Sequence, residues 1–177
     1  TSYWCRLWCR YVAHLSTNYG IERFNSAFHA VVLMGKIDTT NFRHAAGVIL
    51  IHIDGNTNDK ILLLRRSENE TSQHGLWELP GGKLENKQTP KDAAIQETIE
   101  EAGIEPVIIR KLNPHIDESM EKVYHGFIGR IMAKTIDVKL SDEHDKYSWM
   151  TIKEAMNMND PLSHHAQFLF EQWKGVE

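Results

Sequence analysis

The segment that most constrains this chain is residues 81–104, "GGKLENKQTPKDAAIQETIEEAGI", which places a helix between two glycine turns. Thr89 is a residue type that accepts hydrogen bonds well at a helix N-terminus, and Pro90 suits the first helical position. Gly103 is the residue type that most often ends a helix in a left-handed conformation. These signals predict a helix over residues 90–102.

Three glutamates, Glu97, Glu100 and Glu101, crowd onto one side of this helix at spacings of three and four residues. Like charges at these spacings repel each other by roughly 0.2–0.5 kcal/mol per pair. Hard cations such as Mg²⁺ prefer carboxylate and carbonyl oxygens and would turn the repulsion into joint coordination. Gly81 and Gly82 let the backbone come close and offer a carbonyl oxygen. A solvated acidic helix face is the alternative, but it does not account for "WELPGGKLE" just upstream.

The core-facing side of the same helix is expected to carry Ile95, Ile99 and Ala102, which are spaced i, i+4, i+7. Ala93 stands one turn before Glu97 and leaves room beside the carboxylates. The helix should therefore present isoleucines to a core and glutamates to a ligand.

The chain from residue 44 onward alternates strand and helix patterns. Apolar runs predict strands at residues 45–53, 60–66, 106–112, 122–132 and 147–150, a helix at 151–156, and a last helix opened by Pro161. Leu162, Ala166, Leu169 and Trp173 are spaced to face inward along the last helix. Strands around one central helix predict a single α/β domain with a mixed β-sheet over residues 44–177.

Residues 1–43 are weakly patterned and are interpreted as an N-terminal extension. An amphipathic helix is expected at residues 3–15, packed on the domain or on a second copy in a homodimer. The alternative, a helix on a membrane surface, is disfavoured because only two arginines stand on its polar side. Cys5 and Cys9 have no nearby Cys or His pair to complete a zinc set, so we expect free thiols in a reducing cytoplasm.

Composition narrows the partners. The 177 residues are 41% apolar with a net charge of −4. No apolar run approaches the about 20 residues of a membrane-spanning helix. A small negative charge gives no sign of bulk electrostatic binding to nucleic acid. We therefore expect a small-molecule substrate, with no nucleic-acid and no membrane partner.

The glycine and glutamate spacing resembles the signature of the Nudix hydrolases, in particular their MutT-type members. That signature runs Gly, five residues, Glu, seven residues, Arg-Glu-aliphatic, one residue, Glu-Glu, one residue, Gly-aliphatic. The matching positions here are Gly82, Gln88, Gln96, Glu97, Thr98, Glu100, Glu101, Gly103 and Ile104. The resemblance implies an α/β/α sandwich that uses Mg²⁺ or Mn²⁺, held by Gly81, Glu97, Glu100 and Glu101.

Three positions depart from that signature. Gln88 stands where the family has Glu, Gln96 where it has Arg, and Thr98 where it has an aliphatic residue. In the family the arginine helps to orient the first metal-binding glutamate, and Gln96 can do so only as a neutral hydrogen-bonding group. A non-catalytic nucleotide-binding module is therefore the alternative of another class.

A further carboxylate is implied in "SDEHDKYSWM". Glu143 lies six residues before Trp149, a spacing similar to that of MutT-type members, where the glutamate is a metal ligand or base. The alternative is an ordinary exposed glutamate in a loop. The resemblance thus implies Glu100, Glu101 and Glu143 as catalytic residues.

The segments "LLRRS", "HGLWELPGG" and "NDP" resemble those with which MutT-type enzymes hold phosphates and base. They give the candidate substrate-binding residues Arg65, Arg66, His74, Glu78 and Asn159. A solvated strand end for the arginines, a loop cap for His74 and a helix N-cap at Asp160 are the alternatives. The expected reaction is hydrolysis of a nucleoside triphosphate to monophosphate and pyrophosphate. ADP-ribose and diadenosine polyphosphates are the alternative substrates.

Overall fold

The fold is built around β1 (Arg43–His52), a strand in which every residue from Ala45 to Ile51 is buried. A strand that is apolar at each position is covered on both faces, unlike the alternating strands of a one-sided sheet. The computed structural model describes residues 37–52, 59–132 and 136–173.

The remaining elements follow the order that the sequence predicts. They are β2 (Lys60–Arg66), β3 (Trp77–Glu78), β4 (Gly81–Lys83), α3 (Pro90–Ala102), β5 (Val107–Lys111), β6 (His115–Asp117), β7 (Lys122–Arg130), β8 (His144–Met150), α4 (Ile152–Asn157) and α5 (His164–Trp173). The predicted strands and helices are confirmed in type, although their ends differ by up to three residues. The short strands β3, β4 and β6 were not predicted.

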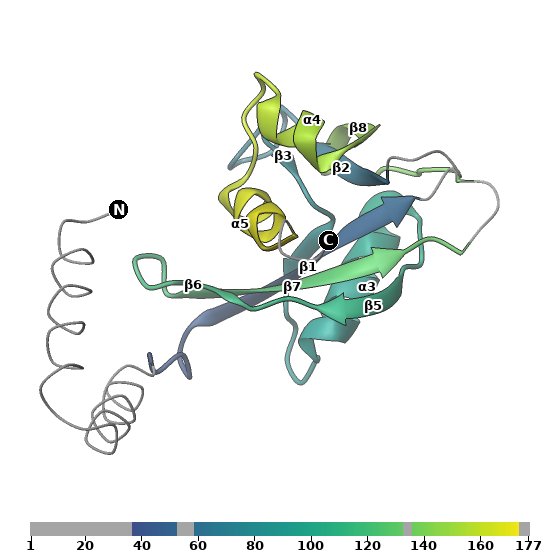
Figure 1. Ribbon diagram of the computed structural model, residues 1–177. Coiled ribbons are helices and arrows are strands. Elements are labelled where there is room, and N and C mark those ends of the chain that lie inside the picture. Colours follow the sequence, from purple (N-terminus) through teal and green to yellow (C-terminus); the bar gives the residue numbers. More distant parts are fainter. Residues whose placement is uncertain (1–36, 53–58, 133–135, 174–177) are drawn as a thin grey trace, which may run out of the picture. The chain divides into compact units, whose positions relative to one another are not determined.

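The sheet is mixed, as expected. β1 lies parallel to β7 and antiparallel to both β2 and β4. Gly47 in the first half of β1 faces Gly81 of β4, whereas Ile51 near its end faces Ile61 of β2, so two strands share one edge of β1. β3 and β8 pair with β2, and β5 and β6 pair with β7 (Figure 1).

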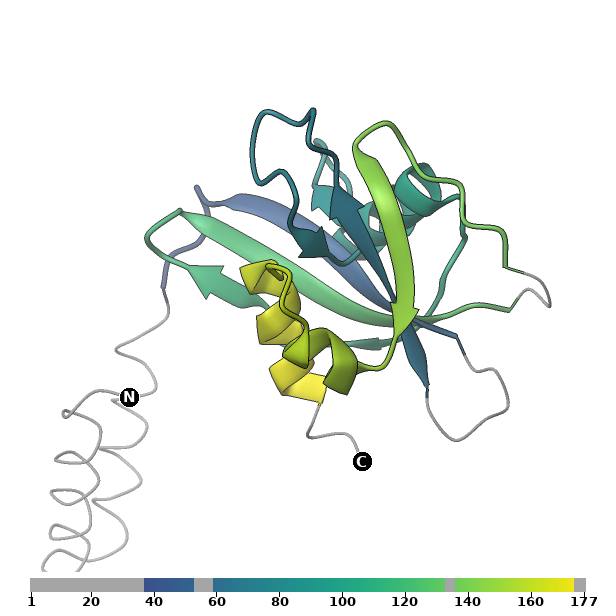
Figure 2. The same cartoon turned by 90° about the horizontal axis from the view of Figure 1, so that it is seen from above.

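Helices cover the two faces of this sheet. Figure 2 places α4 and α5 on one side and α3 on the other, and the packing agrees. On the α3 side the core includes Val48, Leu50, Leu62, Leu64 and Ala94. On the α5 side it includes Ile49, Ile51, Leu63, Leu169 and Phe170. The predicted α/β/α sandwich is thus confirmed.

The predicted buried side of α3 is confirmed for Ala102 but wrong for the two isoleucines. Ile99 is 43% exposed and Ile95 is only partly buried. The buried residues of α3 are Ala93, Ala94, Thr98, Glu101 and Ala102. Small side chains let the helix lie close to β1, and a carboxylate occupies a position that periodicity reserves for an apolar residue. Ala93 is buried in the core, so it does not leave open space beside Glu97.

The start of the last helix also differs from the prediction. Leu162 forms a bridge with Trp77, and the backbone N–H of Trp77 donates to Pro161 O at 2.9 Å. Because Pro161 and Leu162 pair with Trp77, they lie outside the helix, and α5 begins three residues after Pro161, at His164. Ser163 Oγ, just before the helix, accepts the Ala166 N–H at 3.3 Å. Asp160 is not a helix N-cap; it accepts the Trp77 indole N–H at 3.1 Å.

The predictions for residues 3–15, Cys5 and Cys9 lie outside the described residues. Contacts between residues group Thr39–Glu177 into one compact unit. Among the described residues, no helix is both long and apolar enough to cross a bilayer.

Candidate active site

The two ends of α3 are held by the residues that the sequence predicts. Thr89 Oγ1 accepts the Asp92 N–H at 3.2 Å, an N-cap typically worth about 1 kcal/mol. At the other end Gly103 has φ 69°, which glycine adopts without steric cost, and its N–H donates to Ile99 O at 2.9 Å. The last turn, which carries the glutamates, is therefore fixed in place.

The two glycines of β4 bring backbone and carboxylates into contact. A Cβ at Gly82 would collide with the carboxylate of Glu97, and one at Gly81 would collide with the backbone of Ala46 and Gly47. Gly81 N–H donates to Glu101 Oε2 at 2.9 Å. Gly81 thus meets α3 through its N–H, whereas the sequence interpretation assigned it a carbonyl ligand role.

Glu101 is the most perturbed carboxyl group of this site. It is only 6% exposed, and burial is the main reason that its pKa rises to about 9. The Gly81 hydrogen bond opposes the rise, because it stabilises the ionised form. The negative charges of Glu78, Glu97 and Glu143 add to it. Carboxylates from both α3 and the loop side of the site thus raise the pKa of Glu101.

Glu97 shares this environment to a smaller degree. Partial burial raises its pKa to about 6, and the charges of Glu100, Glu143 and Glu85 add to the rise. Elevated carboxyl pKa values that arise from burial and like charges are common at functional sites.

The donor set on α3 fits a hard divalent cation. No ion pair joins Glu97, Glu100 or Glu101 to a cationic side chain in the part of the chain that the structure describes. Carboxylate oxygens in a partly desolvated setting suit Mg²⁺ or Mn²⁺. Within the same residues, no three His, Cys, Asp or Glu side chains are gathered closely enough to hold an ion as they stand.

The two glutamines that depart from the family signature lie together. Gln88 Nε2 donates to Gln96 Oε1 at 2.8 Å, and Gln96 Nε2 donates to Glu100 Oε1 at 2.8 Å. Gln96 thus contacts Glu100 rather than the first glutamate, Glu97.

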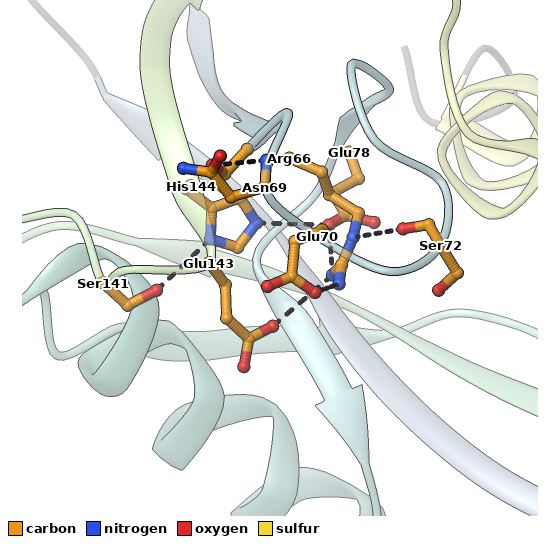
Figure 3. Close-up of polar contacts among 9 residues, drawn as sticks. Arg66, Asn69, Glu70, Ser72, Glu78, Ser141, Glu143 and His144 are labelled. Atoms are coloured by element: carbon orange, nitrogen blue, oxygen red, sulfur yellow. Dashed lines mark hydrogen bonds and ion pairs between the residues drawn. The ribbon is translucent and has the colours of Figure 1, made fainter.

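On the other side of the site, Glu143 ends the loop before β8 and lies beside Arg66 (Figure 3). Its backbone oxygen accepts the Ser67 N–H at 2.8 Å, and its Oε2 lies 3.5 Å from Arg66 Nη1. The same Nη1 donates to Glu78 Oε1 at 3.2 Å, and Nη2 donates to Glu70 Oε2 at 2.5 Å. Arg66 therefore joins three glutamates from three segments.

His144 completes this group and was missed as a site residue. Its side chain is fully buried, and its Nε2 lies 3.2 Å from Glu78 Oε1 (Figure 3). Ser141 Oγ lies 3.4 Å from its Nδ1. The sequence places His144 next to Glu143 but gives no signal that its ring points inward, because the predicted strand begins only at residue 147.

The other candidate substrate residues have different surroundings. Arg65 forms a two-point pair with Asp145, with distances of 2.8 Å from Nε and 2.5 Å from Nη2. This pairing lowers the pKa of Asp145. His74 is exposed on the turn before Gly75, and Asn159 is exposed on the segment before α5. The structure thus groups Arg66 and Glu78 with Glu143, but gives His74 and Asn159 no such contact.

Known proteins are similar to this chain in sequence and fold. The family model described as NUDIX domain matches residues 42–172. An RNA pyrophosphohydrolase of Bartonella quintana is 25% identical over 138 residues, 77% of this chain and 76% of the relative. A CTP pyrophosphohydrolase of Escherichia coli is 31% identical over 104 residues, 55% of this chain and 70% of the relative.

Among solved structures, a MutT protein from Methanosarcina mazei is 30% identical, with a TM-score of 0.62. The match covers 76% of this chain and 94% of that protein. Hydrolases of this family generally use a divalent metal cation. The family match extends over most of the chain and includes both sides of the site described above. The chain therefore belongs to the Nudix family of hydrolases, which act on phosphoanhydride bonds.

Proposed function

We propose that this protein is a Mg²⁺- or Mn²⁺-dependent pyrophosphohydrolase that acts on a nucleoside diphosphate linked to a further group. The preferred substrate is a nucleoside triphosphate, released as monophosphate and pyrophosphate. The observation that carries this proposal is the pair Glu97 and Glu101, whose carboxyl pKa values are raised by burial beside the Gly81–Gly82 backbone. Such groups gain most from a cation that replaces their lost hydration.

The residues divide the work as follows. Glu97, Glu100 and Glu101 would hold the ion, and the Gly81 N–H donates to Glu101. A divalent ion in such a site supplies neutralisation of phosphate charge and a lower pKa for the attacking water. Glu143 takes the proton of that water or completes the ligand set. The reaction cleaves a P–O bond, and the water oxygen stays on phosphorus.

On the substrate side, Arg66 already shares its donors among three glutamates. A phosphate bound there would have to compete with those carboxylates, so we propose that Arg66 mainly orients Glu143 and Glu78. The proposed direct contacts are His74 for phosphate and Asn159 for the base, with Arg65 available if its pair with Asp145 opens.

A second candidate substrate is the triphosphate at the end of an RNA chain. The observation in its favour is the similarity over 138 residues to a protein named RNA pyrophosphohydrolase. The phosphoanhydride chemistry is shared with a free nucleoside triphosphate, and only the group beyond the first nucleotide differs.

A substrate panel tests these proposals. The purified protein is given nucleoside triphosphates, a 5′-triphosphorylated RNA, diadenosine tetraphosphate and ADP-ribose, with and without Mg²⁺ or Mn²⁺, and the products are separated by ion-exchange chromatography. We expect metal-dependent release of pyrophosphate from a nucleoside triphosphate, and none with Glu101→Gln. Nucleotide binding without hydrolysis of any panel member would instead identify a non-catalytic binding module.

A further inference from the structure

Three hydrogen bonds run in series from the loop after β4 to the last turn of α3. Glu85 N–H donates to Gln88 Oε1 at 3.0 Å, Gln88 Nε2 donates to Gln96 Oε1, and Gln96 Nε2 donates to Glu100 Oε1, the last two at 2.8 Å each. We call these four residues the amide relay. The relay ends at Glu100, one of the proposed metal ligands.

The direction of each bond in the relay is set by its two ends. A backbone N–H, at Glu85, can only donate, and an ionised carboxylate, at Glu100, can only accept. Each amide between them has one donating and one accepting end. The orientation with Gln88 Oε1 toward Glu85 and Gln96 Nε2 toward Glu100 is therefore the one that satisfies every pair.

The loop end of the relay is anchored independently. Gln88 N–H donates to Glu85 O at 3.1 Å, which closes a turn in which Lys87 has φ 69°. The next residue, Thr89, is the N-cap of α3. Gln88 thus sits between a closed turn and a capped helix, so its side chain has a fixed origin from which to reach Gln96.

We propose that Gln88 and Gln96 act together as positioning residues, which aim one oxygen of Glu100 without neutralising its charge. This inference rests on the proposed role of Glu100 as a metal ligand. An arginine that contacted Glu100 would place a positive charge next to the incoming cation, whereas an amide fixes the carboxylate by direction alone. The amide therefore orients Glu100 without adding a positive charge beside the ion.

One substitution distinguishes this positioning role from a purely electrostatic effect on metal binding. Gln88→Glu adds a negative charge near a cation site, which by charge alone should tighten Mn²⁺ binding. In the relay it replaces a donor by an acceptor, so Gln96 has to turn its nitrogen toward residue 88 and its oxygen toward Glu100. We expect Mn²⁺ affinity, measured by calorimetry without substrate, to fall by about three- to tenfold, as expected for loss of one hydrogen bond. Asn86→Glu adds the same charge on the same loop outside the relay, and should leave affinity unchanged or raise it.

A second substitution should restore the relay. In the double variant Gln88→Glu with Gln96→Arg, the carboxylate accepts from Glu85 N–H and from the arginine, and the arginine donates to Glu100. The net charge equals that of the wild type, and we expect affinity to return to within about twofold of it, a non-additivity typical of residues in direct contact. Gln96→Arg alone brings donors against the Gln88 amide and should bind Mn²⁺ more weakly than the double variant. Purely additive effects of the two single changes would overturn the proposal.

The relay can also be tested in the absence of metal. In the metal-free protein, Glu100→Gln should shift the side-chain amide NMR signals of both Gln96 and Gln88, although Gln88 does not touch Glu100. A shift confined to Gln96 would overturn the relay. If the protein fails to hydrolyse any substrate while these amide shifts and the affinity cycle hold, the proposed activity fails and the relay stands.

Discussion

The two sides of the site handle negative charge in opposite ways. On the α3 side, Glu97, Glu100 and Glu101 form no ion pair within the described residues, and burial raises two of their pKa values. On the loop side, Glu143 shares Arg66 with two other glutamates. The α3 side has no cationic partner among the described residues, whereas Arg66 balances negative charge on the loop side.

This difference indicates a division of labour. Buried carboxylates without a cationic partner destabilise a fold, and the proposed external cation would stabilise Glu97 and Glu101 on α3. Carboxylates that already share a guanidinium gain less from such an ion and are held in defined positions instead. We therefore expect changes on the α3 side to act on metal binding, and changes on the loop side to act on turnover.

The largest effect on the loop side of the site is expected at Glu143. If it serves as a base, Glu143→Gln should lower kcat by about 10²–10⁴-fold. Folding should be little affected, because the carboxylate is exposed and its 3.5 Å contact with Arg66 is long. Steady-state kinetics check this, with Asp142→Asn as the matched control in the same loop. If the control costs more activity than Glu143→Gln, the catalytic carboxylate is misassigned.

Removal of Arg66 should have a smaller effect of the same kind. Arg66→Met leaves Glu143 and Glu78 without their shared donor, and we expect kcat to fall by about 10–100-fold, as for other groups that orient a ligand or base. KM should change little. Arg110→Met, which changes an exposed arginine on β5 outside the site, is the control. A large rise in KM with little change in kcat would show instead that Arg66 contacts substrate phosphate.

A third effect concerns the stability of the protein rather than its turnover, and it arises on the α3 side. The pKa of Glu101 rises from its usual 4.5 to about 9 in the folded protein, so between these values the folded state holds a proton that the unfolded state has lost. The stability from this group is therefore full at low pH and is lost as pH rises. In urea unfolding of the metal-free protein, the wild type should lose more stability than Glu101→Gln between about pH 5 and about pH 8. Glu105→Gln, an exposed neighbour beyond the helix, should behave as the wild type. Equal pH dependence in wild type and Glu101→Gln would contradict the raised pKa.

The α3 side of the site could be predicted from the sequence because its features depend on residues that are close together in the chain. Thr89 and Gly103 act on backbone groups within their own helix, so the bounds of α3 follow from neighbouring residues alone. The glutamate spacing likewise lies within one helix. The burial of α3 did not follow, because periodicity assigns the inner side to Ile99, whereas the fold places Glu101 there.

The other side depends on contacts between distant segments. Arg66, Glu78 and Glu143 meet because β2 pairs with both β3 and β8. Strand register decides which side chains face one another, and a single sequence does not specify the register of short strands such as β3. The buried His144 illustrates this, since its role depends on where β8 begins. The amide relay also joins loop to helix, so the sequence shows two unusual glutamines but not their mutual contact.

The most direct test of the division of labour is a calorimetric Mn²⁺ titration of the substrate-free protein in three forms. We expect the wild type to bind the ion with a dissociation constant in the millimolar range or tighter, as for sites built from a few carboxylates. Glu100→Gln with Glu101→Gln should abolish binding, whereas Glu143→Gln should keep it within about threefold, the change expected when an exposed charge is lost. Unchanged binding in the α3 double variant, or loss of binding in Glu143→Gln alone, would contradict the assignment of the ion to α3.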